Sequence, residues 1–158
     1  MSHFTNALTV HISKNETQLF LANHTSEAAV GTLAIGFENV LPGPIRVTPP
    51  RPIDLELAIE YIEEEVMPWA QKLPAQPYLC LVGNEEVVNV ITALFDQDAS
   101  KPYSIDQIED AFRRLCEIAE GSPAKGNESL ITPVAVSTLL ILREMMHHIG
   151  FNELQLYR

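Results

Sequence analysis

The 158-residue chain has few positive charges. Its ten Lys and Arg residues are outnumbered by 21 Asp and Glu residues, which gives a formal net charge of −11 at pH 7. Nucleic acids and anionic membranes attract basic surfaces, so this balance argues against both as partners. It also disfavours a small phosphate ligand, because the few basic residues are scattered along the sequence.

The chain also has only two cysteines and no apolar run long enough to span a membrane. Cys80 and Cys116 fall in a predicted strand and a predicted helix, and we expect small buried side chains rather than a disulfide or a nucleophile. The first residues lack the charged and apolar regions of a secretion signal. The longest apolar run, within residues 130–142, is interrupted by Arg143 and Glu144. We therefore expect a cytoplasmic protein.

The composition and length predict one globular domain covering residues 1–158. Hydrophobic residues make up 46% of the chain and charged residues 20%, which excludes wholesale disorder. A chain of this length can bury a sizeable core. We therefore assign no domain boundary.

The amino-terminal third predicts a three-strand meander. Residues 8–13 alternate in character, residues 14–16 form a polar turn, and residues 18–22 supply the return strand of a hairpin. Residues 32–40 predict a third strand. Residues 42–52 contain five prolines and predict an extended connection.

Helices and two further strands are expected in the remainder. The first helix covers residues 53–72, with Asp54 as its N-cap and an early end or kink at Pro68. A strand at residues 78–82 is followed by a helix at 84–95, capped by Asn84, and by a polar loop at 96–103. The next helix starts at Ser104, with Gln107 completing a capping box, and a loop follows at 121–127. The last helix runs from Thr132 to Ile149 and ends at Gly150, and a final strand covers residues 154–157.

This order, β-β-β-α-β-α-α-α-β, predicts an α/β fold of the ribonuclease H-like type used by actin-like ATPases. We expect a mixed five-stranded sheet with flanking helices. The meander contributes three strands, and the helix-separated strands join in parallel through right-handed crossovers.

The segment from Tyr78 to Phe95 carries the main functional clue. A buried strand, Gly83 and a helix is the arrangement that presents a helix N-terminus to an anion. Here, however, Glu85 and Glu86 occupy the first turn of that helix. Two explanations remain open: the carboxylates stabilise the helix dipole, or they fill a vacated anion site and repel phosphate.

Residues 11–19, 32–36 and 82–87, together with the order of the elements, carry a family resemblance. By these features the chain resembles the second actin-like domain of the exopolyphosphatase / guanosine pentaphosphate phosphohydrolase family. The resemblance spans nearly the whole chain in element order. Residues 11–19 correspond to the family's first glycine-rich motif, residues 32–36 to its next strand, and residues 82–87 to its second phosphate-facing turn. Ile12, Thr17, Leu19, Gly36 and Gly83 match the family at those positions.

The departures from this family argue against catalysis. Family glycines let backbone N–H groups approach phosphates, and non-glycine residues replace most of them here. The family's acidic residues correspond to His11 and Gln18, and the family's first domain is missing. We therefore assign no catalytic residue and no cofactor. The candidate ligand-binding cleft consists of Ser13, Lys14, Asn15, Thr17, Gly83, Asn84 and Glu85.

No metal site is expected. His147 and His148 are adjacent on a predicted helix, so their side chains diverge by about 100° and do not form a two-point ligand set. Histidines near a helix C-terminus are instead stabilised by the dipole. The glutamates at residues 56, 60, 63 and 64 are interpreted as a solvated helix face.

Two functions are compatible with these features. The leading hypothesis is a non-catalytic relative of the exopolyphosphatases that acts by association, either as a homodimer or with a separate protein partner. The alternative is a residual phosphatase or a domain that binds nucleotide or polyphosphate, using Lys14, Asn15 and Thr17 with the Gly83 turn.

Overall fold

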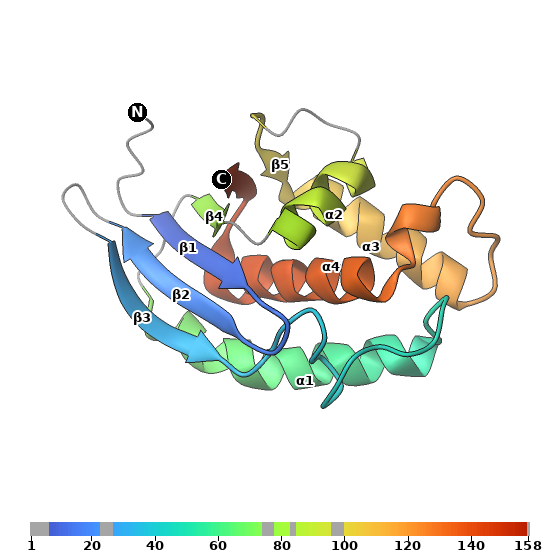
Figure 1. Ribbon diagram of the computed structural model, residues 1–158, viewed down its shortest axis with the longest axis horizontal. Coiled ribbons are helices and arrows are strands. Elements are labelled where there is room, and N and C mark those ends of the chain that lie inside the picture. The colour runs from blue at the N-terminus through green and yellow to red at the C-terminus, as the bar shows by residue number, and fades with distance from the viewer. Residues whose placement is uncertain (1–6, 23–26, 74–77, 83–84, 96–99, 158) are drawn as a thin grey trace.

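Three strands open the described chain, and helices separate the strands that follow. The computed structural model describes residues 7–22, 27–73, 78–82, 85–95 and 100–157 (Figure 1). The elements are β1 (Ala7–Ile12), β2 (Thr17–Ala22), β3 (Glu27–Leu33), α1 (Pro52–Ala70), β4 (Tyr78–Val82), α2 (Glu85–Phe95), β5 (Tyr103–Ser104), α3 (Ile105–Ala119), the 3₁₀ turn η1 (Glu128–Leu130), α4 (Pro133–Met145), the π-helical turn η2 (Met146–Gly150) and β6 (Glu153–Tyr157).

The sheet is mixed, with strand order β3-β2-β1-β4-β6-β5. β1, β2 and β3 pair antiparallel, which confirms a meander at the start of the chain. β4 lies parallel to β1 and to β6, as expected for strands joined through helices.

The described sheet has six strands, so the expected number of five is wrong. The additional strand is β5, which pairs antiparallel with β6 in a segment expected to be polar loop. Tyr103 is fully buried there, and its ring lies 5.2 Å from that of Phe95. One aromatic side chain therefore gives a short edge strand its place in the core.

The third strand was predicted too late in the sequence. It covers Glu27–Leu33 rather than residues 32–40. Ile35, Phe37 and Val40 are buried, but they lie in a loop in which Gly36 and Asn39 form an isolated bridge. Their alternating pattern reflects burial by a folded loop, which periodicity alone does not distinguish from a strand.

The first helix begins one residue and ends two residues before the predicted positions. Pro52 occupies its first position, where a missing N–H is tolerated, so Arg51 is the N-cap and Asp54 is not. The carboxylate of Asp54 accepts hydrogen bonds from the Arg51 backbone N–H (2.9 Å) and from its guanidinium. The helix continues through Pro68 and ends at Ala70.

Local capping signals identified the starts of the last two long helices correctly. Ser104 caps α3 and Thr132 caps α4, and Gln107 completes the expected capping box. The last helix differs at its end, where a π-helical turn carries the chain to Gly150, whose φ is +96°. Asn84, the predicted cap of α2, lies outside the described residues.

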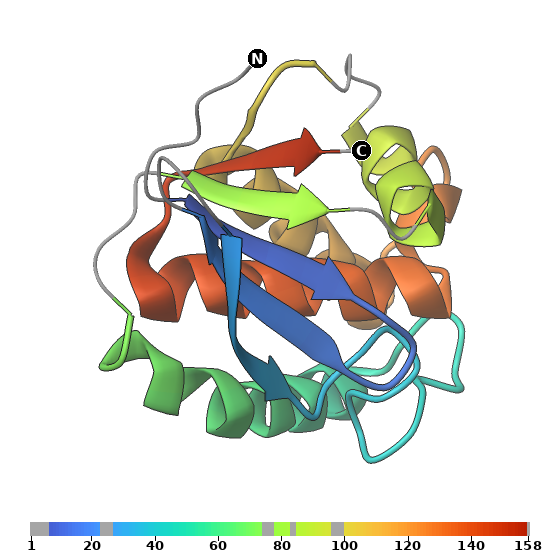
Figure 2. The same ribbon diagram turned by 60° about the vertical axis from the view of Figure 1, so that its left-hand side comes forward.

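The core surrounds α4, which is buried from Ala135 to Leu142. Figure 2 shows β1, β2 and β3 in front of α4, with α1 running alongside it. α1, α2 and α3 all pack against α4. Leu8, Val10 and Ile12 of β1 are fully buried. None of the helices in the described ranges is long and apolar enough to cross a membrane.

Candidate functional site

The turn between β1 and β2 forms the first part of the predicted cleft. Ser13 is half-buried, whereas Lys14, Asn15 and Glu16 are exposed. The Ser13 N–H donates to the Glu16 carbonyl (2.8 Å) and closes the turn. Two of the predicted ligand residues, Lys14 and Asn15, therefore lie at its tip.

The sheet places this turn beside the end of β4. Val10 of β1 pairs in parallel with Leu81 of β4, so the carboxyl ends of both strands lie at the same sheet edge. Glu85 is exposed as the first residue of the following helix. Gly83 and Asn84 lie outside the described residues, so their predicted place in the cleft is untested.

A loop of the protein itself contacts the turn. The Phe37 N–H donates to the carbonyl of Ser13 (3.0 Å), and the Glu38 N–H donates to that of Lys14 (2.8 Å). Gly36 makes this approach possible, because a Cβ there would lie 2.4 Å from both carbonyl oxygens. The turn is thus an anchor for the Gly36 loop (residues 34–40).

Thr17 belongs to this anchor. It is fully buried, and its hydroxyl donates to the Ile35 carbonyl (2.9 Å). The structure therefore gives Thr17 a contact inside the fold rather than an exposed position beside Lys14. The hydrogen bond to Ile35 is enough to explain why a threonine stands at this family position.

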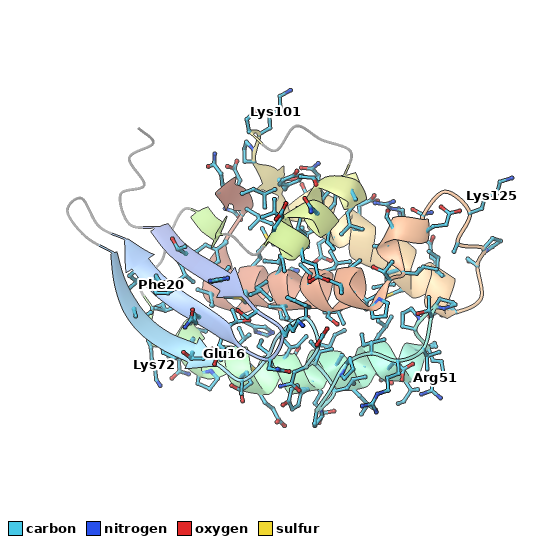
Figure 3. All side chains as sticks on the ribbon, in the orientation of Figure 1. Glu16, Phe20, Arg51, Lys72, Lys101 and Lys125 are labelled. Carbon is cyan, nitrogen blue, oxygen red and sulfur yellow. The ribbon has the colours of Figure 1, made fainter. Side chains whose placement is uncertain are left out.

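The exposed charges around the turn are mainly acidic. Glu16, Glu38, Glu85 and Glu86 are exposed, and Lys14 is the basic residue of the hairpin. In Figure 3 the labelled Arg51, Lys101 and Lys125 lie well away from Glu16. A phosphate approaching this edge would meet more carboxylates than cations.

A second polar group lies where α1, α3 and the end of α4 meet. We call it the Glu144 cluster; it consists of Glu63, Glu109, Arg143, Glu144, His147 and His148. Glu144 is only 2% exposed, and its carboxylate accepts from Arg143 Nη1 (2.8 Å). Its other oxygen lies 3.0 Å from His148 Nε2, which is also 3.5 Å from Glu63 Oε1.

The other half of this cluster is centred on Glu109. Its Oε1 accepts from Arg143 Nε (2.9 Å) and contacts His147 Nε2. The guanidinium of Arg143 also lies over the ring of Phe112, 3.9 Å from its centroid. Arg143 thereby links α3 to α4.

The pKa values of the Glu144 and Glu109 carboxyls are shifted in opposite directions. Burial raises the pKa of Glu144, and the nearby charge of Glu63 adds to this effect. Partial burial of Glu109 acts in the same direction, but its hydrogen bond with His147 and the charge of Arg143 together lower its pKa. Burial therefore dominates at Glu144, whereas the contacts with His147 and Arg143 dominate at Glu109.

The expected divergence of the two histidines is consistent with their partners, because His147 contacts Glu109 whereas His148 contacts Glu144 and Glu63. Sequence reasoning missed these carboxylates and treated Glu63 as part of a solvated surface. Glu144 and His148 are four residues apart, a spacing that could have identified the pair. The contribution of Glu63 from another helix had no local signal.

Cys116 shows no sign of activation. It is half-buried, and burial raises the pKa of its thiol, which keeps it protonated at neutral pH. This fits the expected packing role. The side chain of Cys80 lies outside the described part of the structure.

Solved structures of phosphatases match this arrangement. A Ppx/GppA phosphatase of Aquifex aeolicus superposes with a TM-score of 0.72 over 96% of this chain, at 16% identity. The chain shares its fold with about half of a Ppx/GppA phosphatase. An exopolyphosphatase from Cytophaga hutchinsonii matches with a TM-score of 0.65 at 13% identity, also over 96% of this chain.

The chain spans about half the length of these Ppx/GppA structures. It covers 53% of both proteins, and 55% of an exopolyphosphatase-like protein that matches with a TM-score of 0.66 at 11% identity. No family model and no curated protein matches the sequence. The expected resemblance is thus confirmed as a shared fold.

Proposed function

We propose that this chain is a non-catalytic relative of the Ppx/GppA phosphatases that acts by associating with another protein. The main observation in favour of lost catalysis is the environment of the turn after β1. Its carbonyls hold the Gly36 loop, and the exposed residues around it are mostly glutamates. The sheet order and the parallel β1–β4–β6 pairing support a ribonuclease H-like assignment.

The outer face of α1 supports association. Ile53, Leu57 and Met67 are 47%, 49% and 51% exposed, and their spacing places them on one side of the helix. Large apolar side chains gathered on one exposed face favour an interaction site over chance exposure. We call this surface the α1 face; Glu60 and Glu64 belong to it as well.

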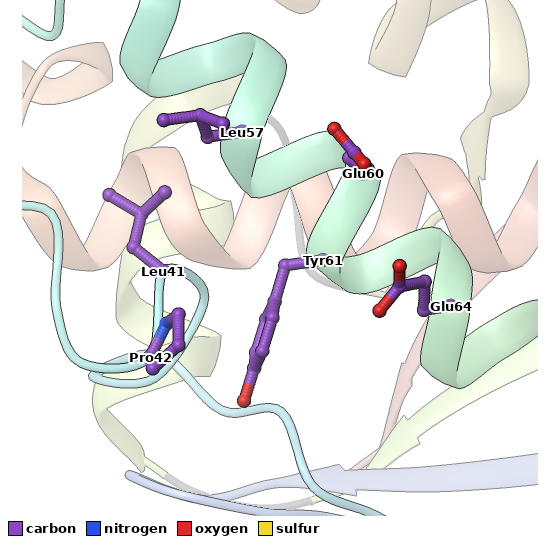
Figure 4. A pocket seen from close by; sticks show the side chains of 6 residues that line it. All are labelled: Leu41, Pro42, Leu57, Glu60, Tyr61 and Glu64. Carbon is purple, nitrogen blue, oxygen red and sulfur yellow. The ribbon is translucent and has the colours of Figure 1, made fainter.

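A shallow pocket opens on the α1 face. Figure 4 shows Leu41 and Pro42 of the preceding connection opposite Leu57 and Tyr61, with Glu60 and Glu64 at the margin. An apolar floor with an acidic margin is complementary to an apolar side chain flanked by Lys or Arg. We therefore propose a partner segment of that chemistry.

A homodimer through the same face is the competing occupant. A twofold contact would bring one α1 face against another, and the glutamates of the two copies would lie close together. Their mutual repulsion disfavours self-association unless the carboxylates are offset. The charge pattern therefore favours a separate, basic partner over a second copy.

A photo-activated cross-linking residue placed at Leu57 tests this proposal in the cells that make the protein. We expect one heteromeric product whose cross-linked peptide is apolar and rich in Lys or Arg. The same residue placed at the exposed Lys125, in a distant loop, is the control and should not give that product (Figure 3).

Substitutions that remove charge from the α1 face provide a second test of the docking proposal. Replacing both Glu60 and Glu64 by Gln should weaken the purified complex and reduce its salt dependence. The matched pair Glu16→Gln and Glu38→Gln, at the sheet edge, should leave it unchanged. A product of twice the chain mass at position 57 would assign the face to homodimerisation, and no specific product would contradict the docking proposal.

The alternative function, binding of nucleotide or polyphosphate, is favoured by one observation. Parallel pairing puts the carboxyl ends of β1 and β4 at one edge, the usual position of ligands in α/β sheets. Under the leading proposal, millimolar ATP, guanosine tetraphosphate or short polyphosphate leaves the melting temperature unchanged. A saturable rise that disappears in Lys14→Ala would support the alternative. Cytoplasmic location remains a prediction in both cases.

A further inference from the structure

The Glu144 cluster is a second candidate site, separate from the proposed association surface. Glu144 and His148 come from the end of α4 and from η2, and Glu63 comes from α1. One donor atom from each of the three side chains lies within 4.8 Å of the other two. Helical segments distant in sequence thus converge on a single point.

We propose that Glu63, Glu144 and His148 form a binding site for one divalent transition-metal ion, of the Zn²⁺ class. Mixed imidazole and carboxylate ligands suit Zn²⁺ and its neighbours, whereas Mg²⁺ and Ca²⁺ prefer sets made of oxygen alone. Three protein ligands leave a further position for water.

The distances between the three ligand atoms suit coordination of a metal ion as well as hydrogen bonding. Ligand atoms placed about 2.0–2.2 Å from Zn²⁺ lie about 3.0–3.5 Å from one another in tetrahedral or octahedral geometry. His148 Nε2 is 3.0 Å from Glu144 Oε2 and 3.5 Å from Glu63 Oε1. Small side-chain movements would therefore complete the coordination.

The charge balance calls for a cation. Three carboxylates and the single guanidinium of Arg143 leave the cluster with two negative charges when both imidazoles are neutral. Glu144 is 2% exposed and shares the Arg143 guanidinium with Glu109, so one cation serves two carboxylates. A divalent ion would neutralise the two remaining negative charges.

The backbone supplies an independent observation. The chain adopts a π-helical turn at Met146–Gly150, closed by the Phe151 N–H donating to the Met146 carbonyl (2.8 Å). Single π-helical turns are rare and are found disproportionately at functional sites. This turn carries both histidines, and His148 Nε2 lies close to carboxylate oxygens of Glu144 and Glu63.

Calorimetric titration with ZnCl₂ tests the site. The untagged 158-residue chain is first treated with EDTA and dialysed. We expect one ion per chain and a higher melting temperature with the metal bound. Co²⁺ should give the visible absorption of a site with an imidazole ligand and low coordination number. MgCl₂ and CaCl₂ should bind at least about tenfold more weakly.

His148→Ala and Glu63→Gln should each weaken Zn²⁺ binding at least about tenfold, because each removes a ligand from a site of three. Both positions are partly exposed, so these variants spare the buried Glu144. His147→Ala is the matched control, since His147 lies in the same turn but contacts Glu109. Circular dichroism checks that each variant is folded.

Three outcomes would overturn the proposal. The first is no one-to-one binding by the wild-type chain at micromolar Zn²⁺. The second is undiminished binding in His148→Ala and Glu63→Gln. The third is an equal loss in His147→Ala, which would move the site to Glu109.

Discussion

Gly36 has no room for a side chain between its own loop and the β1–β2 turn. A Cβ there would lie 2.4 Å from the carbonyl oxygens of Ser13 and Lys14, and backbone atoms of a closed turn cannot move aside as a flexible side chain can. The residue was noted in the sequence only as a match to a family position. The structure shows the close approach that requires glycine.

We expect Gly36→Ala to lower the free energy of unfolding by about 1–3 kcal/mol, the usual cost of an overpacked contact. Urea denaturation followed by circular dichroism measures this change. Glu38→Ala, an exposed side-chain change in the same loop, is the control and should stay within about 0.5 kcal/mol of wild type. A Gly36→Ala variant as stable as wild type would show that the loop does not rest on the turn.

Asp54 gives a prediction about pH. Hydrogen bonds from Arg51 lower the pKa of its carboxyl below the ordinary 3.8, although burial opposes them, so the folded state prefers the ionised form. Stability from this group is present above pH 3.8 and is lost as pH falls through the lower folded pKa.

Asp54→Asn should therefore destabilise the protein at pH 7 by about 0.3–1 kcal/mol, because the amide keeps an acceptor oxygen but loses the negative charge that Arg51 and the helix N-terminus favour. The difference from wild type should shrink as the pH falls below 3.8 in a series of urea titrations. Asp106→Asn, an exposed carboxylate in the first turn of α3, is the control. A constant difference across the series would contradict the assigned ionisation.

At the scale of elements, α3 depends on a reciprocal cap that joins it to the short strand β5. The Ser104 hydroxyl accepts from the Gln107 N–H (3.2 Å), and the Gln107 side-chain carbonyl accepts from the Ser104 N–H (2.9 Å). Two of the unsatisfied donors at this helix start are thereby paired. Ser104 is also the last residue of the edge strand β5, so the cap joins the two elements.

We expect Ser104→Ala to destabilise the chain by about 1 kcal/mol and Ser104→Thr to retain most of its stability. Chemical denaturation at pH 7 gives both values. Ser122→Ala, in an exposed loop, should have no measurable effect. If Ser104→Ala matched Ser122→Ala, the cap would contribute nothing to the fold.

For the whole molecule, the sheet and all four α-helices contribute to one hydrophobic cluster. The chain has a single tryptophan, Trp69, near the end of α1. Its ring lies against Gly31 of β3, where an added Cβ would come within 2.1 Å of it. Its fluorescence therefore reports the packing of α1 against the far edge of the sheet.

We predict one cooperative unfolding transition, with the same urea midpoint by tryptophan fluorescence and by far-ultraviolet circular dichroism. Tryptophan fluorescence reports the packing of α1 against β3, whereas circular dichroism reports helical content throughout the chain. Coincident curves would agree with one domain over residues 1–158. A fluorescence midpoint clearly below the other would show that the β3 edge unfolds separately.

The sequence by itself determined the type and order of most elements, the caps of α3 and α4, and the resemblance that the solved structures confirm as a shared fold. These features depend on residues close in sequence, where periodicity and capping chemistry act directly. The acidic character of the α2 start was also visible, because Glu85 and Glu86 are adjacent to a strand and a glycine.

Only the tertiary structure decided which residues meet. It placed the Gly36 loop on the β1–β2 turn, gave Tyr103 a buried position in an extra strand, and brought Glu63 to Glu144 and His148. Each of these contacts joins segments that are distant along the chain or depends on how a loop folds back. Local propensity carries no information about such pairings, because their free energy arises from packing between elements that have already formed.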